Sequence, residues 1–249
     1  MRCPYPAPMP TSLPMKPHQN LSKKKAMEER KRNDPIQATW FTDPLCCWSW
    51  GMQPHLDQWQ AGYGDQLTLQ YVMGGMLPSW QQFHDEANNV SRPVQMGPVW
   101  MHAAQLMGRP VHHQVWMKDP PASSYPACIA VKAAALQLPE AGITLFRNLQ
   151  QALMAAGKNI ASWPILQSLA AQLVAEYPAF DLRQFEADYK QDAAIDAFKQ
   201  DLARVAQYRI TRFPTLLIEI PGQKGILLAG YRTGEGIMQA VEQAFPNLV

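Results

Sequence analysis

Two adjacent cysteines lie in the stretch of this chain that is best suited to chemistry. The stretch reads DPLCCWSWG over residues 43–51, and Cys46 and Cys47 stand between an apolar run and an amphipathic run. The first turn of a helix leaves backbone N–H groups without partners, and the helix dipole favours a negative charge at that end. We therefore predict that Cys46 is acidified, because the thiolate is the nucleophilic form of cysteine.

The flanking segments predict the elements that position these cysteines. Residues 36–41 alternate between apolar and polar side chains, which indicates a buried strand. Residues 52–63 carry apolar side chains at helical spacing, and residues 66–73 alternate as a second strand. The order strand, helix, strand begins a βαβ unit, with the cysteines between its first strand and its helix.

The middle of the chain is predicted to be helical, and the strand period returns after it. Helical spacing is found over residues 97–107, 125–138, 143–156, 162–176 and 181–207. Ser162 and Asp181 stand at helix starts, where short polar side chains act as N-caps. A hairpin is predicted over residues 215–220 and 225–229, and a closing amphipathic helix over residues 234–245.

Composition separates the first residues from the rest. The chain has 249 residues and is 47% hydrophobic, enough for a sizeable core, but no run approaches the ~18 uncharged apolar residues of a membrane span. Residues 1–35 have a net charge of +5 and seven of the 22 prolines, whereas the remainder has −3. We predict that residues 1–34 form a disordered leader. The alternative is a tail for nucleic acid or an acidic partner, but the body carries no matching basic face, so no nucleic-acid or membrane partner is predicted.

The cysteine usage predicts a reducing compartment. Four cysteines in a chain of this length do not make a disulfide scaffold. Cys46 and Cys47 are adjacent, Cys3 lies in the leader, and Cys128 is isolated in an Ala-rich helix, where it is expected to be a small core residue. With no apolar segment typical of a secretory signal, we expect the cytoplasm.

Four motifs together resemble the DsbA-like thioredoxin superfamily, in its cytoplasmic branch of predicted dithiol–disulfide isomerases. They are DPLCCWSW at 43–50, GGMLPSW at 74–80, SYPACIAVKAA at 124–134 and RFPTLL at 212–217. The resemblance implies an α/β fold, thioredoxin-like, with a large inserted α-helical domain. The thioredoxin-like domain is then expected over 35–80 and 210–249, and the inserted helical domain over 81–209.

The chain departs from the family at the second cysteine of its Cys-x-x-Cys motif. The first cysteine of the motif matches Cys46, but the second position is Ser49. A serine does not resolve a mixed disulfide, so the resemblance implies monothiol chemistry at Cys46, with an external thiol such as glutathione as co-substrate and no bound cofactor. Cys47 is an alternative resolving thiol, although a disulfide between neighbouring residues is strained.

The second part of the site is expected around Pro214. In this fold a cis-proline at the start of the third strand faces the active-site cysteine, and the residue before it pairs with an extended substrate. The resemblance therefore implies substrate binding by Phe213, Pro214 and Thr215. Trp48 and Trp50 are the candidates for an apolar rim, with core packing as the alternative.

Three functions follow from these expectations. The first is a thiol–disulfide oxidoreductase or isomerase acting on protein or small-molecule thiols and disulfides. The second is a non-catalytic protein-binding adaptor, because the superfamily includes an adaptor that delivers a stress regulator to a protease. The third, a glutathione transferase of the kappa type, ranks last because its serine aligns nearer Cys46 than Ser49. No metal site is predicted, since His84, His112 and His113 lack zinc-ligand spacing.

Overall fold

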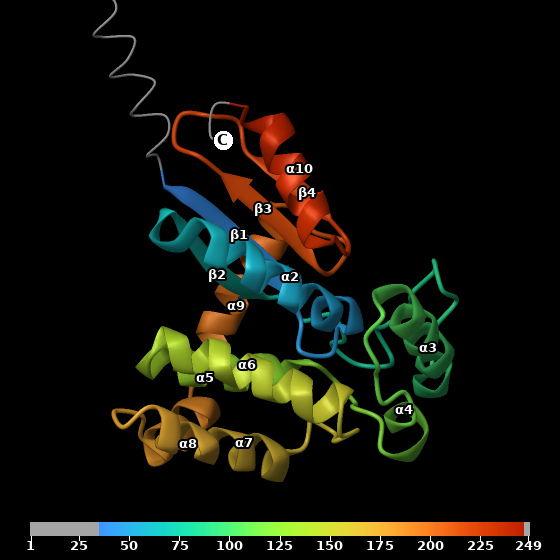
Figure 1. Ribbon diagram of the computed structural model, residues 1–249. Coiled ribbons are helices and arrows are strands. Elements are labelled where there is room, and N and C mark those ends of the chain that lie inside the picture. Colours follow the sequence, from blue (N-terminus) through green and yellow to red (C-terminus); the bar gives the residue numbers. More distant parts are fainter. Residues whose placement is uncertain (1–34, 247–249) are drawn as a thin grey trace, which may run out of the picture.

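A four-stranded mixed sheet forms the centre of the fold. The computed structural model describes residues 35–246. The strands are β1 (Ile36–Thr42), β2 (Leu67–Met73), β3 (Thr215–Glu219) and β4 (Ile226–Ala229), in the order β2-β1-β3-β4. β1 pairs with β2 in parallel, whereas β3 is antiparallel to both β1 and β4 (Figure 1). The predicted thioredoxin-like α/β class is confirmed.

The register of β1 decides which face of the sheet each side chain reaches. Trp40 belongs to the main core, and Phe41 belongs to a second cluster with Val72 and Leu217 on the other face. Successive side chains of a strand point to opposite faces, so both faces of β1 are buried. Phe41 is paired with Thr215, which brings the end of β1 next to the start of β3.

Helices cover both faces of the sheet. α2 (Cys47–Tyr63) follows β1 and packs against α10 (Gly234–Ala244), which closes the chain. η1 (Gly64–Gln66) connects α2 to β2. The long insertion between β2 and β3 contains η2 (Pro93–Gln95), α3 (Met96–Met107), α4 (Val115–Lys118), α5 (Tyr125–Gln137), α6 (Pro139–Met154), α7 (Trp163–Glu176), α8 (Leu182–Lys190) and α9 (Asp192–Gln207).

The insertion is helical as predicted, but some predicted helix limits are wrong. α6 begins at Pro139 rather than at residue 143, and α4 was not predicted. Residues 181–207 form two helices, α8 and α9, because Gln191 between them has an extended backbone (φ −101°, ψ 170°). The break lets α8 pack against α5 and α7 while α9 reaches β2. Asp181 caps α8 as predicted, accepting from the N–H groups of Arg183 and Gln184. Ser162 holds the N-cap position of α7, but its hydroxyl makes no capping hydrogen bond.

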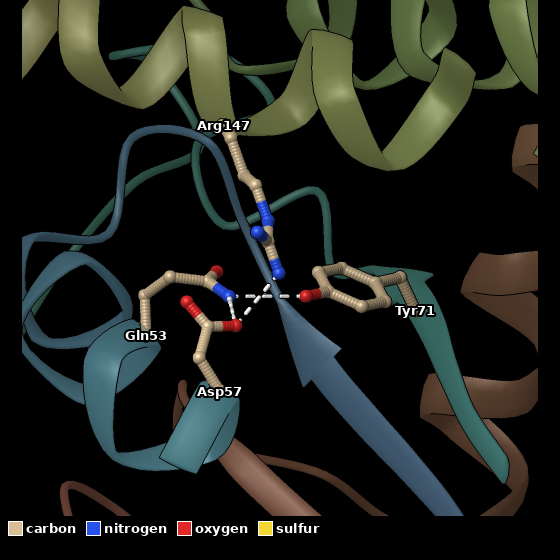
Figure 2. A network of polar contacts seen from close by, with 4 residues as sticks. All are labelled: Gln53, Asp57, Tyr71 and Arg147. Atoms are coloured by element: carbon tan, nitrogen blue, oxygen red, sulfur yellow. Dashed lines mark hydrogen bonds and ion pairs between the residues drawn. The ribbon is translucent and has the colours of Figure 1, made fainter. Parts of the chain in front are cut away.

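A polar network joins the insertion to the thioredoxin-like part. Gln53 of α2 donates to the Asp57 carboxylate at 3.0 Å and to the Tyr71 hydroxyl of β2 at 3.1 Å. Arg147 of α6 reaches the same carboxylate at 2.7 Å (Figure 2). The Asp57 carboxylate therefore joins α2 to α6, and Gln53 connects it to β2, although both members of the ion pair are partly exposed.

The predicted leader, residues 1–34, lies outside the described residues, and the predicted domain limits stay predictions. Within residues 35–246, no helix is both long and apolar enough to cross a membrane.

Candidate functional site

A tight turn between β1 and α2 positions the two cysteines. The N–H of Cys46 donates to the Asp43 carbonyl at 3.0 Å, and the Asp43 carboxylate accepts from the Leu45 N–H at 2.9 Å. Cys46 occupies the N-cap position of α2, and its carbonyl accepts the first helical hydrogen bond, from Trp50, at 3.1 Å. The predicted position of Cys46, between the strand and the first helical turn, is therefore the observed one.

Asp43 is buried beneath this turn and connects it to the insertion. Its second carboxylate oxygen accepts from the Met76 N–H at 2.7 Å and from the Cys128 thiol at 3.6 Å. Burial raises the pKa of the Asp43 carboxyl, against the hydrogen bonds from the N–H groups of Met76 and Leu45, which lower it. The carboxyl thus fixes the loops on either side of it rather than facing solvent.

The prediction that Cys46 is acidified is wrong for this structure. The side chain is only 3% exposed, and burial raises the pKa of its thiol to about 11. The Ser49 hydroxyl and the N–H groups of Ser49 and Trp48 lower that pKa, while the Asp43 charge raises it. Burial destabilises the thiolate more than the N–H groups of the first turn of α2 stabilise it. The net effect is therefore a raised pKa.

The thiols of Cys47 and Cys128 are also shielded from solvent. Cys47 and Cys128 are free and buried, and burial raises the pKa of both well above the ordinary value. Cys128 is a core residue as predicted, with an added contact to Asp43. Ser49 is fully buried, and its hydroxyl lies where it acts on the pKa of Cys46.

The predicted second half of the site lies at the same end of the sheet. The bond between Phe213 and Pro214 is cis. Thr215 pairs with Phe41, which stands two residues before Asp43, and the Thr215 hydroxyl donates to the Arg212 carbonyl at 2.6 Å. The Pro214 carbonyl accepts from the Gly230 N–H at 2.7 Å. Among the described residues, neither backbone group of Phe213 has a hydrogen-bond partner.

The two predicted rim tryptophans have different surroundings. Trp48 is half-buried and faces the Tyr231 ring, with centroids 5.9 Å apart. Trp50 is nearly buried, and its indole N–H donates to the Pro110 carbonyl at 3.3 Å. Arg109 lies over the Trp50 ring and donates to its backbone carbonyl, and burial lowers the pKa of this guanidinium.

Other aromatic and hydroxyl side chains of the insertion and of the loop after β2 serve packing. Trp100 and Trp116 are fully buried, with ring centroids 5.0 Å apart, and Trp80 packs edge-on against Trp116. Ser123 and Ser124 both contact the backbone of Leu77. Within residues 35–246 there is no group of three His, Cys, Asp or Glu side chains that could hold a metal ion.

An open groove in the described surface lies away from the cysteines. It runs between α2 and α10 and is lined among others by His55, Trp59, Glu235 and Met238. None of the predicted site residues lines it. His55 instead contacts the Tyr231 hydroxyl at 3.0 Å.

Asp43 stands at the start of the predicted cysteine stretch but was given no role there, and Arg109 was not predicted to lie in this region. Asp43 comes directly after a predicted buried strand, and a residue at that position is expected to be buried as well. The sequence therefore contained a signal for Asp43. Arg109 gave no such signal, since its place over Trp50 depends on how α3 packs against α2. The two residues lie 66 positions apart in the chain.

Comparisons with known proteins agree with this geometry. A family model described as thioredoxin matches residues 40–237. The chain is 27% identical over 206 residues to the ClpXP adapter protein SpxH of Halalkalibacterium halodurans, covering 82% of this chain and 66% of that protein. It is 29% identical over 184 residues to SpxH of Bacillus subtilis, covering 73% and 58%. The chain therefore spans less than two thirds of the length of these curated relatives.

Solved structures show the same fold. A putative protein disulfide isomerase from Nitrosomonas europaea superposes with a TM-score of 0.69 at 24% identity, covering 84% of this chain and 97% of that one. The cytosolic disulfide reductase DsbM from Pseudomonas aeruginosa gives 0.59 at 23% identity, covering 77% and 88%. Because the thioredoxin family model matches residues 40–237, which is most of the chain, this chain belongs to the thioredoxin family.

Proposed function

We propose that this chain is a protein-binding adaptor on a thioredoxin scaffold, and that Cys46 does no thiol chemistry at neutral pH. The observation that carries the proposal is the closed state of Cys46, which is buried and has its pKa raised to about 11. Such a thiol is ionised in roughly one molecule in ten thousand at pH 7. Ser49, at the second position of the motif, supplies no resolving thiol.

The names of the related proteins also support the proposed adaptor function. The curated relatives carry the name ClpXP adapter protein, and they are more similar in sequence than the solved oxidoreductase structures. We extend this name to the present chain as a proposal: it holds a partner protein for delivery to a protease of the ClpXP kind. Three free thiols among the described residues fit a cytoplasmic location.

The start of β3 is the proposed contact for an extended partner segment. Both backbone groups of Phe213 lack partners among the described residues, so a segment lying alongside could pair with them as an added strand. Pro214 and Thr215, which follow this position, are buried, so the added strand would pair with the backbone of Phe213.

The test separates binding from thiol chemistry. Wild type and Cys46→Ala are incubated with oxidised glutathione at pH 7 and measured by intact mass, and their binding to purified ClpXP is measured by co-sedimentation. We expect no adduct on Cys46 in the folded protein, and equal ClpXP binding by both proteins. An adduct on Cys46, or binding that disappears in Cys46→Ala, would contradict the adaptor function.

A second candidate, a monothiol oxidoreductase, is favoured by one observation. The Ser49 hydroxyl and two backbone N–H groups lie where they lower the pKa of Cys46, as a thiolate site requires. If an opening motion hydrates Cys46, these groups remain to stabilise the thiolate. Under this candidate Ser49→Cys restores a Cys-x-x-Cys pair and raises insulin reduction with dithiothreitol well above that of wild type. Under the adaptor function both proteins stay inactive. The kappa-type glutathione transferase remains last.

A further inference from the structure

A small lobe beside the cysteines differs from the rest of the surface. The α3–α4 lobe, residues 93–118, consists of η2, α3, α4 and their connection, and it stands to one side of the sheet (Figure 1). Its contacts to the body run chiefly to α2. Arg109 and Pro110 meet Trp50 in the first turn of α2, so the lobe borders the candidate site directly.

The inner face of α3 is an ordinary core face. Met96, Trp100 and Ala103 are buried, at positions that fall on one side of the helix. Trp100 packs against Trp116 of α4, which joins the two helices of the lobe. Burial of the side chains on this inner face therefore explains the position of the lobe.

The outer face of α3 lacks the charges of an ordinary surface helix. The exposed residues follow one continuous arc of the helix: Pro98, Met101, His102, Gln105 and Leu106. Leu106 is 63% exposed, and Met117 of α4 is 71% exposed. Four of the eight large apolar side chains that are exposed in residues 35–246 lie in this lobe. Gathered apolar side chains on a surface mark an interaction site rather than chance exposure.

The charges around the lobe have one sign. No Asp or Glu occurs from residue 87 to residue 118, whereas Arg92, Arg109 and Lys118 lie in that stretch. Arg92 and Lys118 are exposed, and Arg109 is half-buried. This is a local charge of +3 within a body whose net charge is −3. Apart from the histidines, the charged side chains within residues 92–118 are therefore all cations, and Asp119 follows Lys118 directly.

We propose that the outer face of the α3–α4 lobe binds an amphipathic helix of a partner protein, with an apolar stripe flanked by carboxylates. The apolar side chains take the stripe, and the exposed Arg92 and Lys118 pair with the acidic flanks. The proposal deepens the proposed adaptor function, on which it rests, by naming the surface and the chemistry of the partner.

Charge decides against the two occupants that this chain itself supplies. A symmetric pair of copies joined through the lobe would place the same patch against itself, and therefore cations against cations. The segment before residue 36 has a net charge of +5 and would be repelled by a basic lobe. An acidic partner helix has neither difficulty.

The probe is a synthetic helical peptide of about 18 residues with a Leu stripe flanked by Glu, compared with the same peptide carrying Lys in place of Glu. Fluorescence anisotropy is measured with the full chain at about 0.05 M and about 0.2 M salt. We expect the Glu peptide to bind at least about tenfold more tightly than the Lys peptide, with weaker binding at the higher salt.

Substitutions locate the binding surface. Met101→Glu and Leu106→Glu should each weaken binding of the Glu peptide by about tenfold or more, because each adds a carboxylate to the apolar face. Leu136→Glu is the matched control, since Leu136 of α5 is 47% exposed and lies outside the lobe. Circular dichroism and thermal unfolding verify that all three variants fold.

Several outcomes would overturn the inference. They are no binding of the Glu peptide at about 100 μM, equal binding of the Lys peptide, or an equal loss in Leu136→Glu. A wild-type dimer in sedimentation that Met101→Glu separates would show that a second copy is the occupant. The glutathione measurement on Cys46 is independent of all of these. An adduct on Cys46 together with normal peptide binding would contradict the adaptor function alone. The absence of an adduct together with the absence of peptide binding would contradict the proposed binding surface alone.

Discussion

The Cys46 site and the α3–α4 lobe both adjoin the first turn of α2, yet the site and the outer face of the lobe have opposite physical properties. Cys46 is buried, and a charge on its sulfur is disfavoured. The lobe carries exposed apolar side chains and only cations. The position at which the family motif places a nucleophile is therefore closed, while the neighbouring surface is open. The comparison teaches that a thioredoxin fold can keep the backbone geometry of its motif site while the proposed partner-binding surface lies next to that site.

The largest effect is expected from two neighbouring residues on α3. Trp100 is fully buried against Trp116, so Trp100→Ala should lower the free energy of unfolding by about 3–5 kcal/mol. Met101 is exposed, and Met101→Ala should change it by less than about 0.5 kcal/mol. Urea unfolding measures both variants. Equal losses would mean that the outer face is packed and is not a free surface.

The next effect concerns the carboxyl beneath the cysteines. Asp43→Ala leaves the buried N–H groups of Leu45 and Met76 without an acceptor, so we expect a loss of about 2–3 kcal/mol in urea unfolding. Asp43→Asn keeps one of the two acceptor oxygens and should lose less. If Asp43→Ala proved as stable as wild type, the carboxyl would not hold the turn in place.

The alkaline side of the stability curve tests Cys46. Its folded pKa is raised to about 11 from an ordinary 9.0, so its contribution to stability is fully present below pH 9 and is lost as pH rises through the folded value. We expect wild type to lose about 2 kcal/mol more than Cys46→Ala between about pH 9 and pH 11. Urea midpoints across this range provide the comparison, and parallel curves would contradict the raised pKa.

The contribution of Asp43 to stability changes with pH in the same direction, but in the acidic range. Its folded pKa is also raised above the ordinary 3.8, so its protonated form stabilises the fold at low pH and this contribution is lost as pH rises.

The smallest effect is expected in the polar network of Figure 2. Arg147→Ala removes the ion pair with Asp57, whose two side chains are both partly exposed. Exposed pairs contribute about 0.2–1 kcal/mol, and salt screens them. The loss should therefore be under about 1 kcal/mol and should shrink further at high salt. A loss of several kcal/mol would show that this network holds the insertion in place.

Periodicity in the sequence predicted most of the fold. The alternation in β1 and the return of the strand period at β3 and β4 are local patterns, so they could be read directly. The break at Gln191 could not, because residues on both sides keep helical spacing and only packing against different neighbours separates α8 from α9. Helix existence was thus easier to predict than helix boundaries.

The site was predicted in position but not in electrostatics. The placement of Cys46 at the start of α2 follows from the strand and helix around it. Its pKa depends on how deeply the turn is covered, and this region is in contact with residues distant in the chain, such as Met76 at Asp43 and Pro110 at Trp50. The absence of acidic residues from 87 to 118 was visible in the sequence, but only the structure shows that it coincides with an exposed apolar face.

The most direct test is the ionisation of Cys46 itself. In a variant carrying Cys3→Ser, Cys47→Ala and Cys128→Ala, alkylation by iodoacetamide is followed by intact mass between about pH 6 and pH 11, with the urea-unfolded chain as the reference. We predict that the folded protein reacts far more slowly than the unfolded chain at neutral pH, with its rate still rising near pH 11. A folded protein whose fast alkylation has already reached its plateau below pH 7 would contradict the closed site and restore Cys46 as a nucleophile.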